Sequence, residues 1–188
     1  MRQTPHTRDA YCWFADMPTR WADNDVYGHV NNTAYYGFFD SAVNRFLIEK
    51  NALDIEIGDQ IGLVVQTSCA YFAPLSFPNI LSVGVRAERV GRTSVTYGLG
   101  VFGAGQNTAS AQGRFVHVYV DRQSRKPKSL NENLRRAVMS ISRPRSRTAP
   151  SRSKITDAES RTHNVRPSSA RSRYSSWCAS RRRACLSR

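Results

Sequence analysis

The spacing of apolar residues is most regular between residues 32 and 50, where it predicts one long helix. Seven apolar or aromatic side chains recur there at intervals of three or four, the pattern of a helix with a wide buried face. They are Tyr35, Phe38, Phe39, Ala42, Val43, Phe46 and Leu47. Asn31 or Asn32 is suited to cap the N-terminus of this helix. At ~1.5 Å per residue the helix would be roughly 28 Å long, so it needs a broad surface to pack against.

Segments rich in β-forming residues lie on both sides of this helix and can supply that surface. A short aromatic strand is expected over 11–21, broken near Pro18, and a polar turn over 22–31. Longer strands, separated by Pro and Gly turns, are predicted over 61–72, 80–90, 93–102 and 109–121, with a short helix over 129–141. The simplest arrangement of these elements is an α+β fold in which an antiparallel sheet curls around the central helix.

Basic residues are concentrated at the C-terminal end and divide the chain into two parts. The whole chain carries a net charge of +14, but residues 142–188 hold 13 Lys+Arg and only 2 Asp+Glu, together with 12 Ser. The preceding 141 residues have a net charge of only +3. We therefore expect a folded domain over 10–141 and a disordered Arg/Ser-rich tail over 142–188. The nearly neutral domain argues against a nucleic-acid-binding function, apart from nonspecific binding through the tail.

The cysteines and the apolar runs bear on cofactors and on cellular location. None of Cys12, Cys69, Cys178 and Cys185 belongs to a C-x-x-C pair, so the sequence predicts neither a metal site nor a redox cofactor. No apolar run is long enough for a signal peptide or a membrane span. We expect a cytoplasmic protein that needs no cofactor, with Cys12 and Cys69 as buried thiols.

The stretch 20–32, RWADNDVYGHVNN, places two carboxylates just before the long helix. A helix N-terminus presents unpaired backbone N–H groups, which can polarise a carbonyl and hold the oxyanion formed when that carbonyl is attacked. A carboxylate beside such a site suits acyl transfer or hydrolysis. Asp23 and Asp25 could equally shape a turn and cap the helix. The residues alone leave both roles open.

This stretch resembles the active-site loop of the 4-hydroxybenzoyl-CoA thioesterase family, in its W-x-D-x-D-x-x-G-H-V-N-N form. The resemblance continues through the helix and through 68–78, 89–95 and 113–120, so it covers about 10–141 and excludes the tail. It implies a hotdog fold, in which an antiparallel β-sheet wraps around the long helix. It also implies hydrolysis of an acyl-CoA to the free acid and CoA.

The resemblance assigns expected roles to the residues of the loop. Asp25 corresponds to the catalytic carboxylate, which either attacks the thioester or activates a water. The backbone N–H of Asn32 would polarise the thioester carbonyl. His29 is a candidate proton donor to the leaving thiolate, although a structural or substrate-orienting role is favoured. Asp23 is expected to order the loop.

Further residues are expected to contact the substrate. Gly28 would permit an unusual backbone angle or a close approach of substrate, and Asn31 would hydrogen-bond either substrate or loop. The turn containing Arg89, Arg92 and Thr93 resembles the part of the family that meets the phosphates of CoA, which Arg binds through bidentate hydrogen bonds.

Assembly and alternatives complete the expectations. Family members pair two subunits side by side, so the resemblance implies a homodimer or homotetramer in which an Arg of one chain can serve Asp25 of the other.

The candidates to line an acyl tunnel are Tyr35, Phe38, Phe39 and Tyr71. The alternative function is a hotdog protein that binds acyl-CoA or acyl-carrier protein without catalysis. A hotdog dehydratase would carry D-x-N-x-x-H, which this loop does not match.

Overall fold

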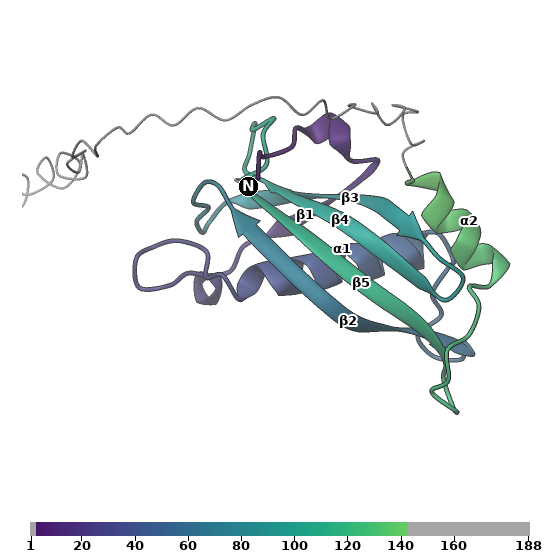
Figure 1. Cartoon of the computed structure of the whole chain (residues 1–188). Helices are drawn as coiled ribbons and strands as arrows, with labels where there is room; N and C mark the ends of the chain where they lie inside the picture. Colours follow the sequence, from purple (N-terminus) through teal and green to yellow (C-terminus); the bar gives the residue numbers. More distant parts are fainter. Residues whose placement is uncertain (1–2, 143–188) are drawn as a thin grey trace, which may run out of the picture. The chain divides into compact units, whose positions relative to one another are not determined.

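The computed structural model describes residues 3–142, in which a five-stranded antiparallel sheet packs on one long helix (Figure 1). The strand order is β1-β3-β4-β5-β2, so β1 and β2 form the two edges. The strands and helices in chain order are β1 (Trp13–Pro18), α1 (Ala34–Glu49), β2 (Gln60–Tyr71), β3 (Ile80–Val90), β4 (Ser94–Phe102), β5 (Ala111–Asp121) and α2 (Glu132–Ser140). Two short 3₁₀ turns, Arg8–Ala10 and Trp21–Asp23, flank β1. This arrangement confirms the predicted α+β hotdog fold.

Helix α1 forms because its apolar residues share one face, and all seven predicted members of that face are buried. Phe39 sits directly over Gly113 of β5, where an added Cβ would come within 2.3 Å of the Phe39 ring. The glycine therefore lets the helix approach the sheet closely. Each fully buried Phe contributes on the order of 1.5–3 kcal/mol relative to an exposed one, so this face is a main source of stability.

The start of α1 differs from the prediction. The N-cap position is Thr33 rather than Asn31 or Asn32, and its side chain makes no capping hydrogen bond. Asn31 acts one step earlier, because its Oδ1 accepts hydrogen bonds from the Thr33 N–H (3.0 Å) and hydroxyl (2.9 Å). Asn31 thus closes a side-chain turn that leads into the helix.

The N-terminal segment covers part of the other face of the sheet. Tyr11 and Phe14 pack there with Phe102, and the Tyr11 ring lies over Gly84 and Gly100, where added side chains would collide with it. Cys12, in the same segment, is exposed, so the prediction that it is a buried thiol is wrong. It lies in the bend just before β1, outside the paired strand. Cys69 is half-buried.

Helix α2 closes the domain beside β3. The Asn131 side chain caps it by accepting a hydrogen bond from the Leu134 N–H (2.8 Å), and Leu134 and Val138 are buried. The Ile141 carbonyl accepts a hydrogen bond from the Ala87 N–H (2.9 Å), and Ser142 forms a β-bridge with Ala87. The predicted tail lies outside the described residues. Within 3–142, neither helix has the length and apolar character needed to cross a membrane.

Candidate active site

Residues 24–30 form a tight loop that turns the Asp25 side chain back onto its own backbone. The Asp25 N–H donates to the His29 carbonyl (2.7 Å), and the Gly28 N–H donates to the Asp25 carbonyl (3.1 Å). Gly28 has φ +78°, in the left-handed region where a glycine is needed. Oδ1 of Asp25 accepts hydrogen bonds from the N–H groups of Tyr27 (2.8 Å) and His29 (3.2 Å). The loop backbone therefore fixes the orientation of the carboxylate.

Contacts with the segment between β2 and β3 fix the position of this loop on the domain. The Val30 N–H donates to the Leu75 carbonyl (2.7 Å), and the Phe77 N–H donates to Oδ1 of Asn24 (3.1 Å). These two bonds lie on either side of Asp25 in the sequence. They tie the loop to a segment about fifty residues later, so the position of the carboxylate depends on the tertiary fold.

The two acids of the loop have different surroundings. Asp23 is only 3% exposed, and its carboxylate accepts hydrogen bonds from the Arg20 N–H (2.6 Å) and guanidinium (2.8 Å). The Arg20 side-chain hydrogen bond lowers the pKa of Asp23. Asp25 is half-buried, and its Oδ2 accepts no hydrogen bond from any residue in 3–142. Asp23 thus stabilises the loop, whereas Asp25 keeps one oxygen free for chemistry.

A hollow of about 430 Å³ brings Asp25 together with the start of α1. Its lining comprises Asp25, His29, Val30, Asn32, Tyr35, Tyr71, Phe72, Ala73 and Pro74. The backbone N–H of Asn32 donates to no acceptor among the described residues. A free N–H just before a helix is a suitable donor to a developing oxyanion. The structure therefore places the predicted carboxylate and the predicted oxyanion donor in one hollow, and His29 with them.

Two tyrosines line this hollow, and a thiol lies near them. The Tyr71 hydroxyl donates to the Asn32 carbonyl (3.1 Å), and its ring packs edge-on against Tyr35, with ring centroids 5.1 Å apart. Burial raises the pKa of the nearby Cys69 thiol to about 11, so at neutral pH this sulfur is protonated and a poor nucleophile. Of the four predicted tunnel residues, Tyr35 and Tyr71 line the hollow, whereas Phe38 and Phe39 belong to the core.

Several features of the site have no local signal in the sequence. The side chain of Tyr71 holds the Asn32 backbone from the end of β2, 39 residues away, and Phe72, Ala73 and Pro74 complete the wall. The partnership of Arg20 with Asp23 was also not predicted. Their spacing of three residues is a usable signal in retrospect, because it allows reciprocal contacts across a short helical turn.

The predicted CoA-binding turn, between β3 and β4, lies at the other end of the sheet from the loop that leads into α1 (Figure 1). Arg89 ends β3, and Arg92 and Thr93 form the β3–β4 turn, where both arginines are exposed. The distance between the turn and the hollow can be measured along β5. Ser94, next to the turn, pairs with Val118, whereas Tyr71 of the hollow pairs with Ala111. Seven residues of strand correspond to ~24 Å. A single chain therefore does not bring these arginines to its own Asp25.

The site has no group of side chains typical of a metal centre. Within residues 3–142, no three His, Cys, Asp or Glu side chains are close enough together to hold a metal ion. The chemistry available in the hollow is that of a carboxylate, a backbone N–H donor and an imidazole.

Comparisons with known proteins agree with this geometry. Residues 19–138 match the model of the thioesterase-like superfamily. No match was found among curated proteins. The crystal structure of the PA5185 protein from Pseudomonas aeruginosa is 50% identical, with a TM-score of 0.72, and the alignment covers 74% of this chain and 97% of that one.

Two further solved structures share the fold. PA2801 of Pseudomonas aeruginosa, proposed to be a thioesterase, is 27% identical over 68% of this chain and 98% of its own, with a TM-score of 0.62. Slr0204 of Synechocystis, a 1,4-dihydroxy-2-naphthoyl-CoA thioesterase, is 20% identical over 67% and 94%, with a TM-score of 0.61, a likeness that shows the fold alone. The family model spans well over half of the sequence, and the chain therefore belongs to the thioesterase-like superfamily.

Proposed function

We propose that this protein is an acyl-CoA thioesterase of the 4-hydroxybenzoyl-CoA thioesterase type, with Asp25 as its catalytic carboxylate. One observation carries the proposal: the same hollow is lined by Asp25, whose Oδ2 accepts no hydrogen bond from the described residues, and by Asn32, whose N–H donates none to them. A thioester carbonyl placed against that N–H would be polarised for attack. Membership of the thioesterase-like superfamily supports hydrolysis of a thioester in general.

Hydrolysis at this site has two possible routes. As a general base, Asp25 takes a proton from a water whose oxygen attacks the thioester carbon, and the C–S bond then breaks to release CoA thiolate. As a nucleophile, Asp25 attacks the carbon itself, the C–S bond breaks to release CoA thiolate, and water then hydrolyses the resulting anhydride to the free acid and Asp25. Both routes require an ionised carboxylate with a free oxygen. His29, which lines the hollow, is the candidate to protonate the thiolate.

Replacing each acid of the loop in turn tests the proposal. Asp25→Asn keeps the shape and removes the charge, so we expect turnover of acyl-CoA to fall by on the order of 10²–10⁴-fold while substrate still binds. Asp23→Asn is the matched control and should lower the melting temperature more than the activity, because Asp23 is fully engaged by Arg20. Asn32→Ala retains the backbone N–H and should leave most activity. Release of CoA, followed with a thiol reagent, measures all three variants. Wild-type turnover by Asp25→Asn would refute the carboxylate mechanism.

We also propose that the chain forms a homodimer, or a pair of dimers, through the edge strand β2. This strand of 12 residues pairs only with β5, and Leu63, Val64 and Val65 are exposed on it. A long apolar edge of this kind is usually covered. Antiparallel pairing of two β2 strands would place the end of one sheet that bears Arg89 and Arg92 beside the Asp25 end of the other.

Light scattering at micromolar concentration tests the assembly. We expect a mass of two or four chains, and Val64→Lys should shift it toward the monomer, because a charge at the centre of the edge opposes pairing. A strictly monomeric wild type would refute the dimer and, with it, the sharing of Arg89 and Arg92 between sites.

A further inference from the structure

A second hollow, of about 390 Å³, lies at the C-terminal end of α1, the opposite end from Asp25. Its apolar wall consists of Leu47, Leu53, Ile55 and Ile61. Its polar groups include His117 and Arg122. The volume is at the lower end of the range for small-molecule sites, and an apolar wall with a few polar groups is their usual composition.

His117 is a buried polar side chain in this hollow that lacks a partner. It is 3% exposed, and its Nε2 is fully buried without a hydrogen bond to any residue of 3–142. Its Nδ1 lies over Gly62 of β2, where an added Cβ would stand 3.2 Å from that nitrogen. Gly62 also lines the hollow, so the glycine keeps space open beside Nδ1. Burial lowers the pKa of His117 to about 4, so at neutral pH the imidazole is uncharged and has one N–H.

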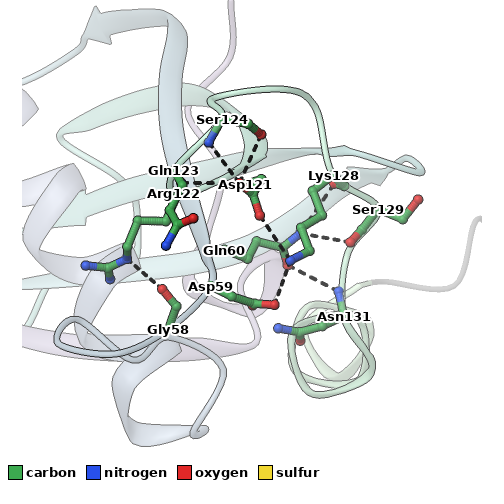
Figure 2. Close-up of polar contacts among 10 residues, drawn as sticks. All are labelled: Gly58, Asp59, Gln60, Asp121, Arg122, Gln123, Ser124, Lys128, Ser129 and Asn131. Atoms are coloured by element: carbon green, nitrogen blue, oxygen red, sulfur yellow. Dashed lines mark hydrogen bonds and ion pairs between the residues drawn. The ribbon is translucent and has the colours of Figure 1, made fainter.

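Arg122 holds the loop that forms one wall of the hollow. Its guanidinium donates to the carbonyls of Gly58 (2.6 Å), Ile55 (2.8 Å), Asp54 (3.2 Å) and Glu56 (3.4 Å). Figure 2 shows the bond to Gly58 and the position of Arg122 at the end of β5. The loop is thereby fixed by its backbone, and the hollow does not depend on side-chain contacts alone.

The positive charge of Arg122 is not neutralised by an ion pair. Across residues 3–142, it forms none with a carboxylate. The nearby Asp59 and Asp121 both pair with Lys128, at 2.6 and 3.4 Å (Figure 2). The Asp54 carboxylate accepts hydrogen bonds from the N–H groups of the loop, which lower its pKa, and Arg122 lowers that pKa further, so Asp54 offsets part of the charge of Arg122 without forming an ion pair. The hollow therefore combines an apolar wall, an unpartnered imidazole and an unpaired cation.

We propose that this hollow binds a small organic acid, with its apolar body against Leu47, Leu53 and Ile55 and its carboxylate toward Arg122 and His117. A carboxylate satisfies both polar features, because it compensates the charge of Arg122 and accepts a hydrogen bond from a Nδ1–H of His117. An alcohol would satisfy the imidazole alone. With the proton on Nδ1, the buried Nε2 keeps only a lone pair, which is less costly to leave unsatisfied than an N–H.

Binding of octanoate to the full-length protein tests this proposal. The reporter is the ring ¹⁵N signal of His117, a residue that lines this hollow. We expect octanoate to shift that signal, and 1-octanol to bind at least tenfold more weakly. Absence of a His117 response to octanoate, or equal binding of 1-octanol, would overturn the proposal. The result does not depend on thioester hydrolysis, which is measured separately.

Two substitutions on one loop provide matched variants. Ile55 lines the hollow and is 65% exposed, whereas Ile57 is 85% exposed and lies outside the lining. Both sites tolerate a charge without loss of the core. Ile55→Glu places a carboxylate at the hollow and should weaken octanoate binding at least tenfold, while Ile57→Glu should leave it unchanged. Equal effects of the two substitutions would show that octanoate binds elsewhere.

Discussion

Acidification should destabilise this protein through His117 before it affects the carboxylates. The ordinary pKa of this side chain is 6.5, and burial lowers it to about 4 in the folded protein. Between these two values the unfolded chain binds a proton that the folded chain does not. The free energy of unfolding therefore decreases as the pH falls from 6.5 to 4, and it becomes independent of this group below 4. Asp23, whose pKa is lowered from 3.8, affects stability only in more acidic solution.

The difference between the pKa values of His117 in the unfolded and folded protein sets the size of the loss in free energy of unfolding. At ~1.4 kcal/mol per pKa unit, the full loss is ~3 kcal/mol, which is a large part of the 5–15 kcal/mol typical of a domain. The structure supports a large value, because the imidazole is 3% exposed, is surrounded by the rings of Tyr97, Phe115 and Tyr119, and has no carboxylate as an ion-pair partner among the described residues. An imidazolium at this position would have to give up most of its hydration.

Urea unfolding at a series of pH values from 7.5 to 4 measures this loss. His117→Phe removes the titrating group and retains an aromatic ring of similar size, so its stability should be nearly independent of pH over that range. His29→Gln is the control, since His29 is exposed, and it should retain the pH dependence of the wild type. The reasoning fails if His117→Phe and the wild type lose the same free energy between pH 6.5 and 4.

Two further predictions concern the core and the domain boundary. Tyr97 and Tyr119 share a buried hydrogen bond between their hydroxyls (2.8 Å), so changing either one to Phe should cost ~1–3 kcal/mol in chemical unfolding, and the double variant should cost less than the sum. A chain that ends at Ser142 should keep its cooperative melt and its activity while losing any nonspecific nucleic-acid binding, because the last described contacts of the domain are those of Ser142. Loss of the melt would place the boundary later.

The fold was largely predictable because its main signals are periodic and local. The apolar face of α1 determines which side of the helix packs on the sheet. Each long strand is bounded by Pro or Gly turns, which can be recognised in the sequence. The errors lie where local rules compete. The first strand ends at Pro18, where the break was predicted, but it begins only at Trp13, and the chain after Pro18 forms a short 3₁₀ turn stabilised by Arg20 and Asp23. Cys12 is exposed because it lies in the bend before β1, where the general preference of Cys for burial does not decide the direction of its side chain.

The predicted site was less complete than the predicted fold, because half of its contacts join residues far apart in the sequence. The loop motif identified Asp25 and Asn32, and the structure brings both to one hollow. No spacing rule places Tyr71 at the Asn32 carbonyl or Leu75 at Val30, since these contacts depend on how β2 is paired and where it ends. The second hollow could not be predicted from the sequence for the same reason. Its His117 sits in an otherwise ordinary strand, and only the pairing of β2 with β5 brings Gly62 beside its Nδ1.

The two acids of the loop differ in how many hydrogen-bond donors contact their carboxylates. Asp23 lies where the backbone and guanidinium of Arg20 converge on it, so its charge is needed to hold the turn. Asp25 receives only two backbone N–H groups, and both go to the same oxygen. That arrangement fixes the carboxylate without saturating it. The proposed catalytic role of Asp25 rests on this free oxygen, and Asn24 between the two acids anchors the loop by accepting a hydrogen bond from the Phe77 N–H.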